Sequence, residues 1–321
     1  MAVPPHQLLL HDGSVMPALG LGTWRMEPAS VGPVIRTALQ LGYRHIDCAS
    51  IYGNEAAIGE ALAEALASGA VERDQLWVTS KLWNDCHAPE QVRPALERTL
   101  ADLGLEHLDL YLIHWPVAHR HGVLLPERPD DQISLERQPL ADTWGAMEDV
   151  VEAGLVRCIG VSNFSSAKLA ALASGARILP AVNQVERHPW LQQNDLLHHC
   201  RERGVVLTAY APLGSGATLD GNSLLEDPQI RSIAAAHGAS AAQVLIAWGL
   251  ACGTAVIPKT VHADRLAENL AAAELRLDQA ELAAIAALDR HHRFIEGSFW
   301  TLPGGPYTLD SLWDEASAPS P

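Results

Sequence analysis

The feature that most constrains the fold of this chain is a regular alternation of short apolar runs with longer segments of helical periodicity. Strands this apolar, each followed by a helix, imply an α/β fold with a parallel sheet covered by helices. Eight such units fit a closed (β/α)8 barrel better than an open doubly wound sheet. The predicted strands are Ala18–Gly22, Arg44–Ile46, Leu76–Thr79, Leu108–Ile113, Val156–Val161, Ala181–Gln184, Val205–Ala209 and Ala255–Ile257.

Helices are predicted between these runs from apolar spacing and from capping residues. Pro89–Leu103 carries apolar residues on one face and charges on the other, and Leu191–Arg203 is a second example. Asp227 before a proline is typical of a helix start. Asp278 and Glu281 form a capping-box pattern before a helix that is expected to end near Leu288.

The 321 residues are expected to form one domain, because barrels of this class routinely reach such a length. A β-hairpin is predicted over residues 6–17, where Asp12-Gly13 separates two short apolar runs, and it would cap one end of the barrel. The barrel is expected over residues 18–288 and a C-terminal loop over 289–321. Two long excursions, Pro116–Pro139 and this loop, are candidates for function because long loops in compact domains often have one.

Composition excludes several classes of partner. A net charge of -16 argues against a nucleic-acid or anionic-membrane binder, since both need a basic surface. No apolar stretch reaches the ~18 residues that span a bilayer, and the N-terminus lacks the basic region of a signal peptide. Five dispersed cysteines suit reduced thiols. We therefore expect a cytoplasmic protein.

Four residues that follow predicted strands could act together. Asp47, Tyr52, Lys81 and His114 would converge on the mouth of a barrel, where strand C-termini meet. An ammonium group favours a neighbouring phenolate, so Lys81 is expected to lower the pKa of Tyr52, while Asp47 holds the ammonium. The phenol could then protonate a developing alkoxide, and the imidazole could orient a carbonyl. Given a hydride donor, such a set can reduce carbonyl compounds.

Five strings of the sequence resemble motifs of the aldo-keto reductase family, in the family's order and spacing. They cover LGYRHIDCASIYGNE at 41–55, LYLIHWP at 110–116, GVSNF at 160–164, YAPLGS at 210–215 and IPKTVHADRLAEN at 257–269. The resemblance runs from about residue 6 to residue 300. It implies NADPH-dependent reduction of aldehydes and ketones to alcohols.

The resemblance assigns roles to individual residues. Tyr52 is the general acid, Lys81 and Asp47 tune it, and His114 orients the carbonyl. Ser162, Asn163 and Gln184 bind the nicotinamide carboxamide, and Tyr210 stacks on the ring. The full set of residues expected to bind NADPH or NADP+ is Thr23, Trp24, Asp47, Ser162, Asn163, Gln184, Tyr210, Pro212, Leu213, Ser215, Lys259, Thr260, Arg265, Glu268 and Asn269.

The cofactor choice and the substrate class also follow from particular residues. Lys259 and Arg265 suit a phosphate dianion, so NADPH is expected over NADH. The substrate is expected to be a small carbonyl compound, an aromatic, medium-chain aliphatic or sugar aldehyde, because indole rings would line its pocket. The substrate residues are Trp24, Trp83, His114, Trp115 and Trp300. The family's usual state makes a monomer the expectation.

The sequence alone leaves alternatives open. Some barrels of this family act as cofactor-sensing regulatory subunits of a membrane channel. A hydrolase would need paired carboxylates, and Glu186 has no obvious partner. No metal site is expected, because His198, His199 and Cys200 are adjacent on a predicted helix and would point in different directions. Gly20-Leu21-Gly22 lacks the third glycine of a dinucleotide-binding fingerprint.

Overall fold

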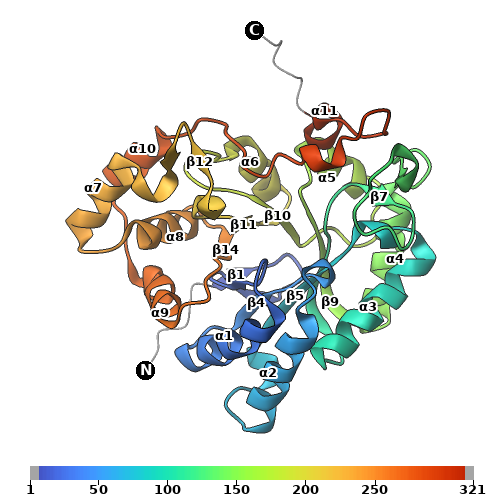
Figure 1. Ribbon diagram of the computed structural model, residues 1–321, viewed down its shortest axis with the longest axis horizontal. Coiled ribbons are helices and arrows are strands. Elements are labelled where there is room, and N and C mark those ends of the chain that lie inside the picture. The colour runs from blue at the N-terminus through green and yellow to red at the C-terminus, as the bar shows by residue number, and fades with distance from the viewer. Residues whose placement is uncertain (1–6, 315–321) are drawn as a thin grey trace.

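The chain forms a parallel eight-stranded barrel surrounded by helices (Figure 1), as the alternation predicts. The computed structural model describes residues 7–314. Strands pair in the order β14-β11-β10-β9-β6-β5-β4-β3, and a parallel bridge between Leu19 and Val256 joins the two ends. The barrel strands are β3 (Leu21–Gly22), β4 (His45–Asp47), β5 (Trp77–Leu82), β6 (Leu108–Ile113), β9 (Val156–Ser162), β10 (Val182–Glu186), β11 (Val206–Tyr210) and β14 (Ala255–Val256).

The seam between the first and last strands explains the two glycines that look like part of a dinucleotide-binding motif. The Val256 N–H donates to the Ala18 carbonyl at 2.7 Å, and the Gly20 N–H donates to Val256 at 2.9 Å. A Cβ on Gly20 would lie 2.7 Å from Cγ of His45, and one on Gly22 would lie 2.8 Å from the Ile257 carbonyl oxygen. These glycines therefore let the backbone close the barrel.

Helices follow the strands and cover the outside of the barrel. The predicted helix Pro89–Leu103 is confirmed with the same bounds. The Asp227 side chain caps α7, and Asp278 and Glu281 form the predicted capping box of α10. The helices are α1 (Pro28–Leu41), α2 (Glu55–Ala67), α3 (Pro89–Leu103), α4 (Leu140–Glu152), α5 (Ser166–Ala173), α6 (Asn194–Glu202), α7 (Pro228–His237), α8 (Ala241–Ala251), α9 (Ala263–Ala271), α10 (Gln279–Ala286) and α11 (Leu309–Trp313).

Some boundaries differ from those predicted. The helix predicted over Leu191–Arg203 begins only at Asn194, because His188 and Leu191 form a backbone bridge. Strand β5 continues three residues past Thr79, because its pairing with β6 extends to Leu82. Lys81 therefore lies on a rigid strand and not in a loop.

The predicted hairpin closes one end of the barrel. Strands β1 (Gln7–Leu9) and β2 (Val15–Pro17) pair antiparallel, and residue 6 of the predicted segment lies outside the described residues. Leu10 and Met16 are buried against Trp77 and Leu110 in a core cluster at the barrel floor. At the opposite end of the barrel, the loops that follow the C-terminal ends of strands such as β6 and β9 surround an open mouth.

The two long excursions both lie over that open end. The first contains the short strand pair β7 (Ala118–His119) and β8 (Gln132–Ile133). The second is the C-terminal tail, which ends in α11 beside α5 and β7 (Figure 1); residues 315–321 of the predicted loop lie outside the described residues. Within residues 7–314 no single helix is long and apolar enough to cross a membrane, and α7 and α8 pass that test only together, with a 92° bend between them.

Candidate active site

The four candidate catalytic residues come together at the mouth of the barrel. Asp47 ends β4, Lys81 lies in β5, and His114 directly follows β6. Tyr52 lies on a single turn of 3-10 helix, Ser50–Tyr52, just after β4. The Lys81 ammonium donates to Oδ1 of Asp47 at 2.5 Å and to the Cys48 carbonyl at 2.7 Å, and it lies 3.4 Å from the Tyr52 hydroxyl.

The Tyr52 phenol stays protonated at neutral pH. Burial raises its pKa to about 12, and the nearby Lys81 ammonium opposes this rise without overcoming it. Lys81 lowers the pKa of Tyr52, as expected, but the effect of burial is larger and the net shift is upward. The physical reason is that desolvation of the phenolate outweighs one ammonium whose charge Asp47 already balances, even though the Tyr52 side chain is only half-buried.

The other two ionisable groups have opposite tendencies. Burial alone would lower the pKa of Lys81, but the Asp47 carboxylate raises it above its ordinary value, so the ammonium is permanently charged. Burial and the Lys81 charge hold the pKa of His114 well below its usual range. His114 is therefore a neutral imidazole, and its ring lies edge-on to Tyr52 with 5.8 Å between centroids.

A chain of hydrogen bonds links this group to the residues predicted to bind nicotinamide. The Gln184 amide donates to Oδ2 of Asp47 at 2.7 Å, and the Ser162 hydroxyl donates to the Gln184 carbonyl at 2.8 Å. The Asn163 amide donates to the His114 carbonyl at 3.0 Å, and the Tyr210 hydroxyl donates to Asn163 at 2.7 Å. The chain fixes all of these side chains, which come from the ends of β9, β10 and β11.

Backbone conformation at the mouth is also unusual. Asn163 has φ 63 and Ala211 has φ 49, so a residue in the left-handed region follows both β9 and β11. Asparagine tolerates this region, whereas alanine is strained there. Pro212, Leu213 and Ser215 lie in the same loop after β11, where a short 3-10 turn spans Gly214–Gly216.

The residues predicted to hold the adenosine phosphate lie around the start of α9. Lys259 and Arg265 are exposed, and within residues 7–314 neither has an ion-pair partner. Thr260 is buried and its hydroxyl accepts from the His262 N–H at 3.2 Å. Asn269 is buried in the same helix. Two unpaired cations at the positive end of a helix fit an anion such as a phosphate.

Three of the predicted substrate residues form one aromatic cluster beside His114. The Trp83 ring lies 4.9 Å from the His114 ring and 5.7 Å from the Trp300 ring, and Trp115 lies 5.9 Å from Trp300. Trp24 stands apart: it is 39% exposed and stacks on the guanidinium of Arg25 at 4.2 Å. Among the described residues Trp24 has no ring contact with the other three.

The sequence did not identify the tail residues that complete this cluster. Trp313 of α11 lies 6.0 Å from Trp115, and Leu312 and Tyr307 are buried in the same group. The Tyr307 hydroxyl donates to the Ile133 carbonyl at 2.5 Å, which fastens the tail to β8. A large aromatic residue in a polar tail was a sequence signal for the burial of Trp313, but no such signal marked Tyr307.

Glu186 proves to be an anchor for the tail. Its carboxylate accepts the backbone N–H groups of Phe294 and Ile295 at 2.8 and 2.7 Å, and it bonds Nε2 of His188 at 2.8 Å. It is buried and has no second carboxylate beside it in these contacts. The pairing that a glycoside hydrolase needs is therefore not formed at Glu186.

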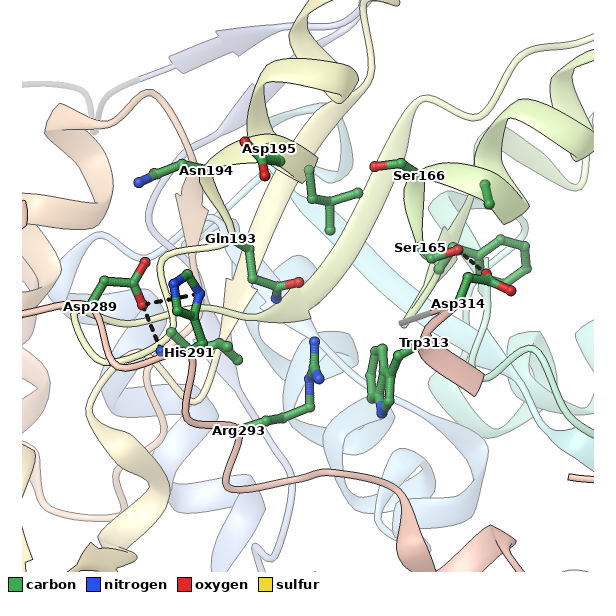
Figure 2. A pocket seen from close by; sticks show the side chains of 14 residues that line it. Ser165, Ser166, Gln193, Asn194, Asp195, Asp289, His291, Arg293, Trp313 and Asp314 are labelled. Atoms are coloured by element: carbon green, nitrogen blue, oxygen red, sulfur yellow. Dashed lines mark hydrogen bonds and ion pairs between the residues drawn. The ribbon is translucent and has the colours of Figure 1, made fainter. Parts of the chain in front are cut away.

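A cavity of about 710 Å³ lies between the loops after β9 and β10 and the tail. Figure 2 shows Gln193, Arg293 and Trp313 pointing into it. None of the four candidate catalytic residues lines it, so it is a neighbour of the catalytic mouth that shares Trp313 with the aromatic cluster. Its lining comprises Phe164–Ala167, Leu191, Gln193–Leu196, Asp289, His291, Arg293, Trp313 and Asp314.

Two groups of metal-ligating residue types lie close together in the sequence or in the structure. His198 has a 76% exposed side chain whereas Cys200 is fully buried, so these neighbours point apart as predicted. In residues 7–314, Asp85, Cys86 and His121 bring ligand atoms within 4.8 Å of one another. The Arg98 guanidinium, however, lies 3.7 Å from Sγ of Cys86, and a cation in that position opposes a metal ion.

The barrel, the Tyr-Lys-Asp-His group at its mouth and the exposed cations at α9 are features that suit an NADP-dependent oxidoreductase built on a (β/α)8 fold. The Aldo/keto reductase family model matches residues 18–290. The chain belongs to the aldo-keto reductase family, which uses NADP(H) and reduces carbonyl compounds.

Similar proteins agree with this assignment over nearly the full length. An aldo/keto reductase of Synechocystis sp. is 54% identical over 312 residues, 95% of each chain. The aldo-keto reductase family 1 member A1 of Sus scrofa is 48% identical over 294 residues, 90% of each chain. The crystal structure of a Bombyx mori aldo-keto reductase in complex with NADP has a TM-score of 0.86 and 36% identity, and the match covers 94% of this chain and 98% of that one.

Proposed function

We propose that this protein reduces aldehydes and ketones to alcohols with NADPH, and that Tyr52 is the general acid. The observation that carries the proposal is the geometry at the mouth. A protonated phenol lies 3.4 Å from an ammonium that a carboxylate holds at 2.5 Å, next to a neutral imidazole. These are the groups that a carbonyl oxygen needs as it becomes an alkoxide.

The roles of the side chains follow from their protonation states. Tyr52 carries a proton that it can donate to the carbonyl oxygen, and the developing tyrosinate is stabilised by the Lys81 charge. Asp47 keeps Lys81 charged and in place. His114, being neutral, offers one N–H to orient the carbonyl without competing as an acid. When bound, NADPH supplies the hydride for the carbonyl carbon.

The residues at the mouth and at α9 fit this cofactor. Lys259, Thr260 and Arg265 would hold the 2'-phosphate, since the two cations are exposed and unpaired among the described residues. Glu268 and Asn269 would contact the adenine. Thr23, Trp24, Pro212, Leu213 and Ser215 would line the middle of the cofactor site, with Ser162, Asn163, Gln184 and Tyr210 at the nicotinamide. Because NADH lacks the phosphate, NADPH is preferred.

The aromatic cluster supports a substrate with an apolar body. The Trp83 ring lies edge-on to His114, and Trp300 of the tail contacts both Trp83 and Trp115. Aromatic, medium-chain aliphatic and sugar aldehydes all offer C–H or ring surfaces that stack on indole. Trp24 lies at the exposed rim and would contact the larger of these substrates.

The domain organisation, the oligomeric state and the location of the protein are also proposals. The hairpin and the tail both pack on the barrel, which suits a single domain of hairpin, barrel and C-terminal loop. We infer that the chain acts as a monomer in the cytoplasm. Light scattering of the purified protein checks this: a mass near 34.5 kDa is expected, and a dimer mass contradicts it.

Turnover tests the proposed function. Purified protein, NADPH and a panel of benzaldehyde, hexanal and a sugar aldehyde are followed at the near-UV band of the cofactor, and the product is identified by mass spectrometry. One alcohol is expected per NADPH consumed, for at least one substrate of the panel. NADPH binding without turnover of any carbonyl compound would instead favour a cofactor-sensing role.

A further inference from the structure

Outside the catalytic mouth, Arg187 is a buried cation with few partners. Its side chain is 1% exposed and its guanidinium stacks on the Trp248 ring at 4.3 Å. Nε donates to the Gln192 carbonyl at 2.9 Å. Both terminal nitrogens, Nη1 and Nη2, are buried and have no hydrogen-bonding partner among residues 7–314. A buried charge left in this state is costly, so an anion placed beside it would stabilise the fold.

The surroundings of Arg187 show where such an anion could form. Cys252 packs against the apolar cluster that contains Trp248, the ring on which Arg187 stacks. Burial lowers the pKa of Arg187, and the Cys252 thiol opposes that shift. Arg201 adds a second positive charge and donates to the Cys252 carbonyl. Asp289 is the carboxylate that interacts with Arg187, but it already accepts the Gln192 and His291 N–H groups.

Cys252 is also the thiol that solvent can reach. Cys48, Cys86, Cys158 and Cys200 are buried, whereas Cys252 is partly exposed at the end of α8. Two guanidinium groups lie close to this residue: Arg201 donates to its carbonyl, and Arg187 stacks on Trp248, four residues earlier in α8. An anion formed on the Cys252 sulfur would therefore have cationic partners.

We propose that Cys252 is a site of peroxide oxidation whose anionic products are held by Arg187. The Cys252 thiolate attacks one oxygen of hydrogen peroxide; an S–O bond forms, the O–O bond breaks, and sulfenate and water result. Sulfur loses two electrons and the peroxide gains them. A second peroxide converts sulfenate to sulfinate in the same way. Each product places oxygen acceptors beside Nη1 and Nη2 of Arg187.

Chemical trapping tests the site. The reduced protein is treated with hydrogen peroxide and dimedone, a probe for sulfenic acid, and adducts are mapped by peptide mass spectrometry. The adduct is expected on Cys252 in preference to the four buried thiols. Cys252→Ser should remove it, and the matched Cys200→Ser should not. Adducts spread over several cysteines, or absent from Cys252, would overturn the proposal.

Substitution of Arg187 tests the role of the cation. Arg187→Met keeps an apolar side chain over Trp248 and is expected to slow trapping at Cys252 about tenfold, because the sulfenate loses a charge-assisted hydrogen bond. Arg187→Lys keeps a charge and should slow it less. An unchanged rate in Arg187→Met contradicts the proposed pairing.

A third comparison leaves Arg187 untouched, so it stands even where its variants do not fold. Cys252→Asp places a fixed carboxylate where the oxidised sulfur would be, and Cys252→Asn is its neutral counterpart. The aspartate variant is expected to unfold at a temperature higher by about 2 °C or more, because only it can pair with Arg187. Equal thermal unfolding midpoints for the two variants, or a lower midpoint for Cys252→Asp, would contradict the proposal.

Discussion

The buried pair of Lys81 and Asp47 gives a prediction that can be worked out from the structure. The side chains are 0% and 3% exposed, and Nζ lies 2.5 Å from Oδ1. Asp47→Asn removes the negative charge and leaves Lys81 buried, with the Cys48 carbonyl, an amide oxygen and the Tyr52 hydroxyl at 3.4 Å as neutral acceptors. Breaking a buried pair in this way typically costs 3–5 kcal/mol, and because the amide oxygen still accepts we expect about 3 kcal/mol.

The double variant Asp47→Asn/Lys81→Met separates this cause from general damage. Removing both charges also removes the stranded cation, so the double variant should lose only about 1 kcal/mol. The assay is urea unfolding at pH 7 followed by tryptophan fluorescence, with Glu97→Gln as control. Glu97 pairs with Arg93 on the surface, at 51% and 61% exposure, so its loss should cost less than about 0.5 kcal/mol. A double variant no more stable than Asp47→Asn would refute the reasoning.

Three further predictions concern the cofactor, the pH profile and stability. Replacing Lys259 and Arg265 by Met should raise the Kd of NADPH by about tenfold or more, measured by fluorescence titration, because charged hydrogen bonds are worth ~1.5–3 kcal/mol; an equal effect on NADH would contradict the phosphate assignment. The pKa of His114 lies well below its usual range, so His114 should not titrate near pH 6.5. The pH profiles of kcat/KM for the wild type and for His114→Gln should therefore have the same shape around that pH, and a wild-type inflection there that the variant lacks would contradict this. Burial raises the pKa of Glu55 from its ordinary value of 4.5 to about 7. The stability that the protonated Glu55 contributes is therefore full below pH 4.5 and is lost as the pH rises through about 7. The free energy of unfolding of Glu55→Gln, relative to that of the wild type, should therefore be about 2–3 kcal/mol more favourable at pH 8 than at pH 4.5. Urea unfolding of both proteins at both pH values measures this, and an equal difference at the two values would contradict it.

The barrel could be predicted because its pattern is local and repeated. Apolar runs such as Leu108–Ile113 read as strands without reference to the rest of the chain, and capping at Asp227 and Asp278 depends only on neighbouring residues. The end of β5 was predicted three residues too early, at Thr79, because Lys81 is polar and its place in the strand depends on pairing with β6.

The catalytic group was predictable as a set of residues, but its electrostatics were not. Order along the strands brings Asp47, Lys81 and His114 to one edge. Whether the ammonium or burial controls the pKa of Tyr52 depends on how dry the mouth is, and that depends on residues far along the chain. The structure shows that burial is the larger effect.

The tail shows where reasoning from sequence ends. Trp300 was expected in the aromatic cluster, but the contributions of Tyr307 and Trp313 depend on how residues 289–314 cross the mouth. That path is set by Glu186, whose carboxylate accepts two backbone N–H groups of the tail. Such long-range backbone contacts leave no periodic pattern in the sequence.

The central claim is that Tyr52 protonates a carbonyl compound during NADPH-dependent reduction. The most direct measurement is kcat for the best aldehyde with Tyr52→Phe, alongside the NADPH Kd and the control Tyr111→Phe, which changes a buried tyrosine of β6 away from the mouth. We predict that Tyr52→Phe lowers kcat by ~10²–10⁴ while the NADPH Kd changes little, and that Tyr111→Phe stays near wild type. A Tyr52→Phe variant that keeps more than about a hundredth of the wild-type kcat would contradict the account.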